Sequence, residues 1–202
     1  MADLLADPTD DLEEILRDAC GHLARSLDLL SRVVHPPPPG EIGPISVREP
    51  VDFVTDLQRA GRTHVRLEVA VDPALPAASG IARHLEHALL NLILYVTEVL
   101  QPHDTGVVRI GARDSGTDVR IAVGWDGPPV PAEEEGRLFE LRPDIPPAEQ
   151  PLAIGLAVAR EVLRLSGGTL TYSANAGPGP CFLLTLPKWR RAPFPGEPAG
   201  SR

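Results

Sequence analysis

The sequence predicts an α+β fold, a two-layer α/β sandwich in which a mixed sheet carries its helices on one face. Segments in which every second residue is apolar alternate along the chain with segments of helical period. Two pairs of the alternating segments are joined by short connections, which is typical of antiparallel hairpins. A run of four prolines separates all of these elements from one amphipathic helix at the N-terminus.

The N-terminal unit is predicted over residues 9–35. Asp11, Glu13 and Glu14 lie where the helix dipole favours negative charge. Leucines recur at helical spacing along one face and form a seam of the dimerisation type: Leu12, Leu16, Leu23, Leu27 and Leu30. Because an isolated helix cannot bury such a face, we expect a homodimer or a hetero-partner there. The alternative is that the helix packs on its own domain.

The main domain is predicted over residues 45–187, after the stiff segment that follows His35. Its first expected elements are a short strand at 45–47, a helix at 50–60 that buries Phe53, Val54 and Leu57, a strand at 65–71 and a helix at 81–100. A hairpin of 107–113 and 119–123 around Ser115 and Gly116 follows, and then a mostly irregular segment at 126–151. The last expected elements are a helix at 154–166 that ends at Gly167-Gly168 and a hairpin of 170–173 and 182–186. Residues 188–202, rich in Pro, Gly and Arg, are expected to be a disordered tail.

Bulk composition argues against several classes of function. The formal net charge is −9, so bulk electrostatics favours neither nucleic acid nor an anionic membrane. Cys20 and Cys181 lie far apart, and the six histidines show no metal-ligand spacing. No segment reads as a signal peptide or a membrane span, so we expect a cytoplasmic protein.

Four motifs follow one another along the main domain. The helix at 81–100 contains Asn91-Leu92-Ile93-Leu94-Tyr95-Val96, and the end of the following hairpin reads Val123-Gly124-Trp125-Asp126-Gly127-Pro128-Pro129-Val130-Pro131. Arg137-Leu138-Phe139-Glu140 comes next, and then Pro151-Leu152-Ala153-Ile154-Gly155-Leu156-Ala157. This ordered set resembles the boxes of the ATP-binding domain of sensor histidine kinases, in the GHKL ATPase superfamily.

The resemblance implies that the metal and adenine contacts are altered. Asn91 matches the first Asn of its box, but Tyr95 falls where the family has the Asn that binds magnesium, and a neutral phenol is a poor magnesium ligand. Trp125 takes the place of the Asp that accepts the adenine amino proton, although an indole can only donate. Asp126 could replace that Asp only through a one-residue slip of the strand end, which would turn the side chains to the other face.

The resemblance also implies altered phosphate contacts. Gly127 and Gly155 match family glycines. Pro129, Pro151 and Ala153 replace three others, which removes backbone flexibility, an amide donor and room for close backbone approach. We therefore predict that ATP and magnesium binding is lost, that no cofactor or metal is held, and that the protein has no catalytic residue.

His22 is the single candidate phosphoacceptor. It lies on the N-terminal helix without the acidic residue and the proline that follow the phosphoacceptor in the family. The favoured hypothesis is a catalytically inactive histidine-kinase-like regulatory protein that binds a sensor kinase or a response regulator. The alternatives are a histidine phosphotransferase with a vestigial ATPase domain, acting through His22, and a histidine kinase with residual ATP binding.

One further expectation concerns Trp125. It shares the strand parity of Ile121 and Val123, so its indole should point into the former adenine pocket and stack on the ring of Tyr95. The alternative is a surface Trp at a loop edge.

Overall fold

A computed structural model describes residues 41–60, 65–100, 106–141, 150–176 and 178–190. A five-stranded mixed sheet has the order β2-β4-β5-β7-β6. Its strands are β2 (Val65–Val71), β4 (Gly106–Asp114), β5 (Asp118–Trp125), β6 (Thr169–Ser173) and β7 (Cys181–Pro187). β2 and β4 are parallel, and the other neighbours are antiparallel. The predicted hairpins 107–113/119–123 and 170–173/182–186 are confirmed.

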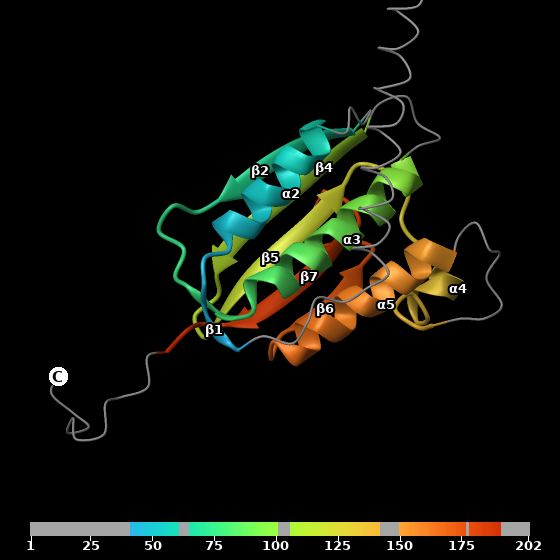
Figure 1. Cartoon of the computed structure of the whole chain (residues 1–202). Coiled ribbons are helices and arrows are strands. Elements are labelled where there is room, and N and C mark those ends of the chain that lie inside the picture. The colour runs from blue at the N-terminus through green and yellow to red at the C-terminus, as the bar shows by residue number, and fades with distance from the viewer. Residues whose placement is uncertain (1–40, 61–64, 101–105, 142–149, 177, 191–202) are drawn as a thin grey trace, which may run out of the picture.

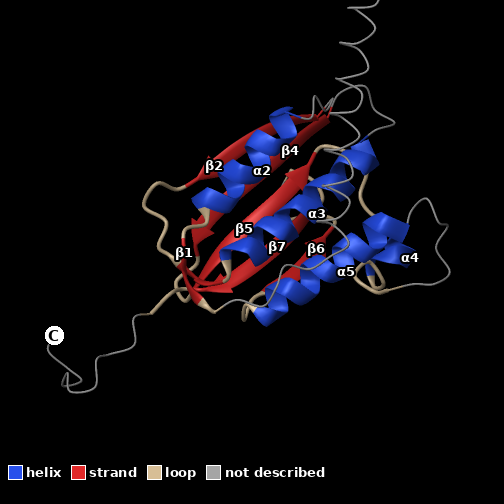
Figure 2. Ribbon diagram, in the orientation of Figure 1, coloured by secondary structure: helices blue, strands red, loops and turns tan. Residues whose placement is uncertain are grey.

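Three long helices lie over one face of this sheet, as Figure 1 and Figure 2 show. They are α2 (Arg48–Ala60), α3 (Ala82–Leu100) and α5 (Gln150–Leu165). The α+β sandwich is therefore confirmed for the described part of the chain. No helix within these ranges is long and apolar enough to cross a membrane.

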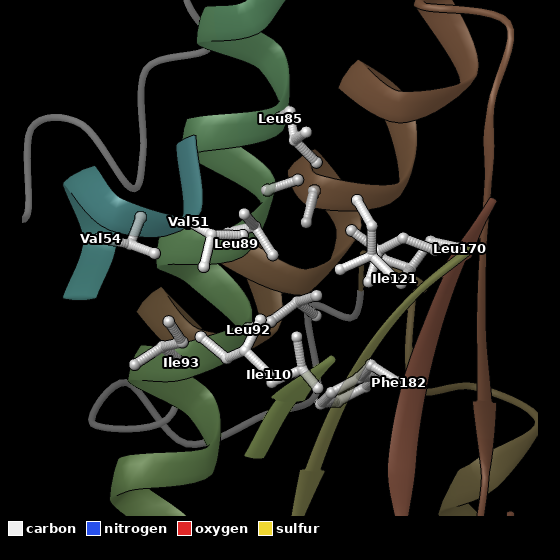
Figure 3. Close-up of a cluster of buried hydrophobic side chains, with 14 of the residues drawn as sticks. Val51, Val54, Leu85, Leu89, Leu92, Ile93, Ile110, Ile121, Leu170 and Phe182 are labelled. Atoms are coloured by element: carbon white, nitrogen blue, oxygen red, sulfur yellow. The ribbon is translucent and has the colours of Figure 1, made fainter. Parts of the chain in front are cut away.

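The core fills the space between the helix layer and the sheet. Leu89 and Leu92 of α3 face Ile110 of β4 and Phe182 of β7 (Figure 3), and all four side chains are buried. Along β5, burial alternates residue by residue, with Val119, Ile121, Val123 and Trp125 facing the helices. The intervening side chains point to the other face of the sheet, which none of the described helices covers (Figure 1).

Glycine occupies two of the predicted turns, one between β4 and β5 and one after α5. Gly116 has φ +86 in the β4–β5 connection, and its N–H donates to the Asp114 carboxylate at 2.8 Å. Gly167 has φ +76 and follows α5, and the N–H of Gly168 donates to the carbonyl of Leu163 at 2.9 Å. Gly116 and Gly167 both occupy a left-handed conformation that other residues rarely adopt.

Several local predictions are corrected. Strands β1 (Gly43–Ile45) and β3 (Ala78–Gly80) form a separate two-stranded sheet, of which the sequence predicts only the first strand, at 45–47. A short helix α4 (Ala132–Glu135) interrupts the segment predicted as irregular. On α2, Val51 is fully buried whereas Phe53 is 39% exposed, so the predicted buried face is rotated.

The end of the domain also differs from the predicted boundary at Pro187. The backbone N–H groups of Lys188 and Trp189 donate to the carbonyls of Thr117 and Ala77, at 3.0 and 2.9 Å. The Lys188 ammonium donates to the Asp114 carboxylate at 2.6 Å. These two residues are thus tied to the rest of the domain, while 191–202 lies outside the described residues.

Candidate functional site

The C-terminal half of α3 carries the first motif. Asn91 is buried, and its amide nitrogen donates to the backbone carbonyl of His87 at 2.9 Å. Tyr95 lies one turn further along and packs edge-on against Phe182, with ring centroids 5.7 Å apart. Desolvation, together with the nearby Glu134 carboxylate, raises the pKa of Tyr95 to about 12. The phenol is therefore neutral at physiological pH and a weak ligand for a hard cation.

Trp125 ends β5 and is 1% exposed. Its indole N–H donates to the backbone carbonyl of Pro128 at 3.0 Å, so its one polar atom is satisfied inside the protein. Its ring lies 5.4 Å from that of Phe182 and 6.1 Å from that of Tyr172, measured between centroids. The predicted inward orientation is confirmed. The predicted ring neighbour, Tyr95, is wrong, because the rings beside the indole come from β6 and β7.

The loop after Trp125 is held by close packing and by hydrogen bonds. A Cβ on Gly127 would lie 2.5 Å from Cδ2 of Leu100, so only glycine fits there without a shift. The backbone N–H of Val130 donates to the hydroxyl of Tyr172 at 2.9 Å. Pro129, between these two anchors, is exposed.

Asp126 points away from the core. Its carboxylate accepts a hydrogen bond from the backbone N–H of Val107 at 2.7 Å, and its own N–H donates to the carbonyl of Val107 at 3.2 Å. The Asp126 side chain thus continues the hydrogen bonding between β4 and β5 past the end of β5. The one-residue slip that would turn it inward has not occurred, since Trp125 holds the inward position.

The fourth motif lies at the start of α5. The helix begins at Gln150, four residues earlier than predicted, so Pro151 and Ala153 belong to its first turn and Gly155 to its second. A proline suits the first turn of a helix, where its missing N–H would have no partner within the helix. Gly155 is buried, and α5 packs beside α3.

A cavity of about 250 Å³ lies between α3, α4 and α5. It brings together Tyr95 and Ala153, two of the predicted site residues. Its other lining residues are Arg137, Leu138 and Glu140 of the third motif, Leu152 and Leu156 of the fourth, and Glu98, Val99 and Glu134, which lie outside the motifs. Three carboxylates and one guanidinium make this lining acidic. The spacing of Glu98, three residues after Tyr95 on one helix face, is the signal that could have pointed to it.

The third motif supports the aromatic cluster. Leu138 is buried, and the Phe139 ring lies 6.1 Å from that of Phe182. The Arg160 guanidinium of α5 stands 5.7 Å from the Phe139 centroid, within cation–π range. Phe182 and Tyr172, the rings beside Trp125, lie far from the motifs in sequence. The site thus joins α3, α4, α5, β5, β6 and β7.

Two sets of predicted residues lie outside the described residues. They are His22 and the seam of Leu12, Leu16, Leu23, Leu27 and Leu30.

The sandwich, the open strand order and the position of these motifs define an ATPase domain of the histidine-kinase type. Residues 80–190 match the family described as histidine kinase-, DNA gyrase B- and HSP90-like ATPase, and the chain belongs to that family.

Comparison with curated proteins points to sensor kinases. The chain is 28% identical over 130 residues to the sensor histidine kinase ZraS of Escherichia coli, a match that covers 64% of this chain and 27% of ZraS. It is 30% identical over 118 residues to the adaptive-response sensory kinase SasA of Prochlorococcus marinus, covering 57% of this chain and 31% of that kinase. Each match therefore spans less than a third of the kinase. The chain is therefore a histidine-kinase-like ATPase domain with distant similarity to sensor histidine kinases.

Solved structures show the same fold. The catalytic domain of the histidine kinase ThkA superposes with a TM-score of 0.61 at 21% identity, covering 74% of this chain and 98% of that domain. The ATP-binding domain of PrrB from Mycobacterium tuberculosis gives a TM-score of 0.58 at 20% identity, covering 75% of this chain and 100% of that domain. At these identities the likeness concerns the fold alone.

Proposed function

We propose that this chain is a regulatory, non-catalytic member of its family, which no longer binds Mg–ATP and acts in two-component signalling by binding other proteins. The observation that carries the proposal is the burial of Trp125 at the position that matches the adenine-binding Asp. Its indole N–H is already bonded to Pro128, and the ring offers no acceptor for an adenine amino group.

The charge and size of the remaining cavity support the proposal. At about 250 Å³, the cavity is at the small end of the roughly 300–1,000 Å³ that is typical of small-molecule sites. Arg137 is paired with Glu140 at 3.4 Å, so Glu98 and Glu134 leave the lining net negative, which disfavours a triphosphate. Tyr95 offers a neutral hydroxyl where a magnesium ligand is required.

The packing at the former phosphate loop supports it further. Pro151 and Ala153 stand inside the first turn of α5, so one backbone position lacks its N–H and another carries a Cβ. The space beside Gly127 is filled by Leu100, which is 2% exposed. Gly127, the glycine that the second motif retains, thus allows Leu100 to pack closely against the loop.

The binding surface that we propose is the leucine seam of the N-terminal helix. It would join a second copy of the chain, or the helices of a sensor kinase or the surface of a response regulator. His22 would have no phosphoryl-transfer role, because the acidic residue that follows a phosphoacceptor in the family is missing after it.

The test is thermal melting of the full chain with millimolar Mg–ATP. A ligand present at about 100 times its dissociation constant adds roughly 2.7 kcal/mol to the free energy of unfolding and raises the melting temperature. We expect no rise. A reproducible rise that disappears when the nucleotide is replaced by an equal concentration of inorganic triphosphate would overturn the proposal.

A further inference from the structure

The open face of the five-stranded sheet contains a groove of about 730 Å³. Its floor is a row of mostly small side chains that lie next to one another in register across all five strands. The row consists of Ala70, Gly111, Ala122, Leu183 and Thr171. The loop between β6 and β7 borders it at Ala176. Since the described helices all lie on the opposite face, the groove is separate from the nucleotide-type site.

One rim of the groove carries an unusual pair of like charges. Arg113 of β4 and Arg120 of β5 are direct cross-strand partners, and both are exposed. Neither makes an ion pair within the described part of the chain. Elsewhere on β4, Arg109 is by contrast paired with Glu68 at 3.2 Å. Two like charges placed directly opposite each other destabilise a sheet, and an anionic group held between them removes that cost.

The sequence contains a segment with the complementary chemistry. Residues 1–11 hold four aspartates, Asp3, Asp7, Asp10 and Asp11, and the first basic residue of the chain is Arg17. Leu4 and Leu5 lie among these aspartates and supply apolar side chains that can cover the small residues of the floor. The segment precedes the leucine seam, which starts at Leu12, so both can act at once.

We propose that residues 3–11 dock intramolecularly in this groove, with the leucines over Gly111 and Ala122 and the aspartates against Arg113 and Arg120. The reach is sufficient. About 30 residues separate Asp11 from Glu41, and even at the helical rise of about 1.5 Å per residue they span roughly 45 Å. The nine residues of β4 cover about 30 Å along the sheet. In this arrangement residues 3–11 cover the open sheet face of their own chain.

Photo-crosslinking in the full chain tests the proposal. A benzophenone amino acid replaces Thr171, which is exposed at the end of the floor row. After irradiation and trypsin digestion, the crosslinked product should contain the peptide 1–17, which ends at the first cleavage site. Mixing heavy-isotope and normal chains beforehand distinguishes docking within one chain from docking between two. We expect heavy–heavy and light–light products only.

Charge variants make the test specific. Arg113→Glu with Arg120→Glu should lower the yield of the 1–17 crosslink about tenfold, because two exposed ion pairs are replaced by repulsion. The control, Arg59→Glu with Arg83→Glu, makes the same change of charge on α2 and α3 and should leave the yield unchanged. Melting of each variant shows that it is folded.

A variant of residues 3–11 tests the pairing without changing any residue of the sheet. Changing all four aspartates, Asp3, Asp7, Asp10 and Asp11, to Asn should give the same tenfold loss without touching the groove. A charge reversal then tests the pairing directly. Asp10→Arg with Asp11→Arg, introduced into the chain that already carries Arg113→Glu and Arg120→Glu, should restore the crosslink, now found in the shorter tryptic peptides that end at positions 10 and 11.

Three results would overturn the proposal. The first is a set of Thr171 crosslinks that avoid residues 1–17. The second is mixed heavy–light products, which mean that a second copy of the chain fills the groove. The third is a crosslink yield that does not change when all four aspartates are replaced.

Discussion

The indole of Trp125 and the phenyl ring of Phe182 lie 5.4 Å apart between centroids, with their planes 35° from parallel. Both side chains are buried, and Phe182 is also an edge-on neighbour of Tyr95 at 5.7 Å. One phenyl ring of β7 therefore connects Tyr95 and Trp125, the two aromatic residues that the sequence motifs match to the family's metal-binding and adenine-binding positions. The Trp125 indole is enclosed by protein atoms, which leads to a first prediction.

Fluorescence should separate Trp125 from Trp189. In a Trp189→Phe variant, the remaining Trp125 emission should be blue-shifted and resist quenching by acrylamide, because the indole is 1% exposed. In a Trp125→Phe variant, Trp189, which is 38% exposed, should emit further to the red and be quenched readily. Red, quenchable emission from Trp125 would mean that the site is open in solution.

Gly127→Ala should destabilise the domain by about 1–3 kcal/mol in chemical denaturation, as is typical of overpacking. Its new Cβ would lie 2.5 Å from Leu100 Cδ2 and 3.2 Å from Trp125 Cδ1. Gly136→Ala is the matched control. It has φ −64 and nothing within 4 Å of the added Cβ, so it should be neutral or slightly stabilising. Equal effects at both positions would contradict the packing described around Trp125.

Ionisation of Tyr95 should contribute to the fall of the free energy of unfolding at alkaline pH. Its pKa is raised to about 12 by burial and by Glu134, against 10.0 for an ordinary tyrosine. Between these two values the unfolded chain has released the proton and the folded chain has not. The contribution is therefore fully present below pH 10 and is lost as the pH rises through about 12. Tyr95→Phe should flatten the fall of the free energy of unfolding in this window, and an unchanged slope would refute the assignment.

The N-terminal seam stays a prediction, since it lies outside the described residues. Leu16→Asp with Leu23→Asp should convert a dimer into a folded monomer, as measured by light scattering of the full chain. The domain itself should melt unchanged, because the core residues that the structure describes all come after Gly43. A wild-type chain that is already monomeric without a partner would show that the leucines pack internally.

Much of the fold follows from local pattern. The alternation along β5 places Ile121, Val123 and Trp125 on one face, and Gly116 and Gly167 mark the ends of their elements. Strand β3 is missed because three residues give no measurable period. The start of α5 is missed because Pro151 reads as a break, although the first turn of a helix accepts proline.

The surroundings of the site depend on contacts distant in sequence. Tyr172 and Phe182 reach Trp125 only because β7 pairs with β5 and β6 pairs with β7. No local sequence motif therefore predicts these two neighbours. The acidic lining depends on α4, a four-residue helix in a segment whose composition predicts a loop. Phe53 illustrates the same limit, because the rotation of α2 is set by where Val51 and Val54 meet the core.

Restoring the family residues should restore nucleotide binding. We expect a variant with Tyr95→Asn, Trp125→Asp, Pro129→Gly, Pro151→Gly and Ala153→Gly to melt at a higher temperature with Mg–ATP than without it. Removing the indole opens space beside Phe182, and the new carboxylate supplies the missing acceptor for the adenine amino group.

The single change Trp125→Asp is the informative control. It creates a cavity and buries a carboxylate beside the rings of Tyr172 and Phe182, so it should cost about 3–5 kcal/mol and fail to bind nucleotide by itself. The combined variant should recover part of that stability when ligand is present, because binding to the folded state adds to the free energy of unfolding. If the combined variant is folded and still indifferent to Mg–ATP, the five replaced residues are not what prevents binding, and the acidic lining of the cavity becomes the cause to test.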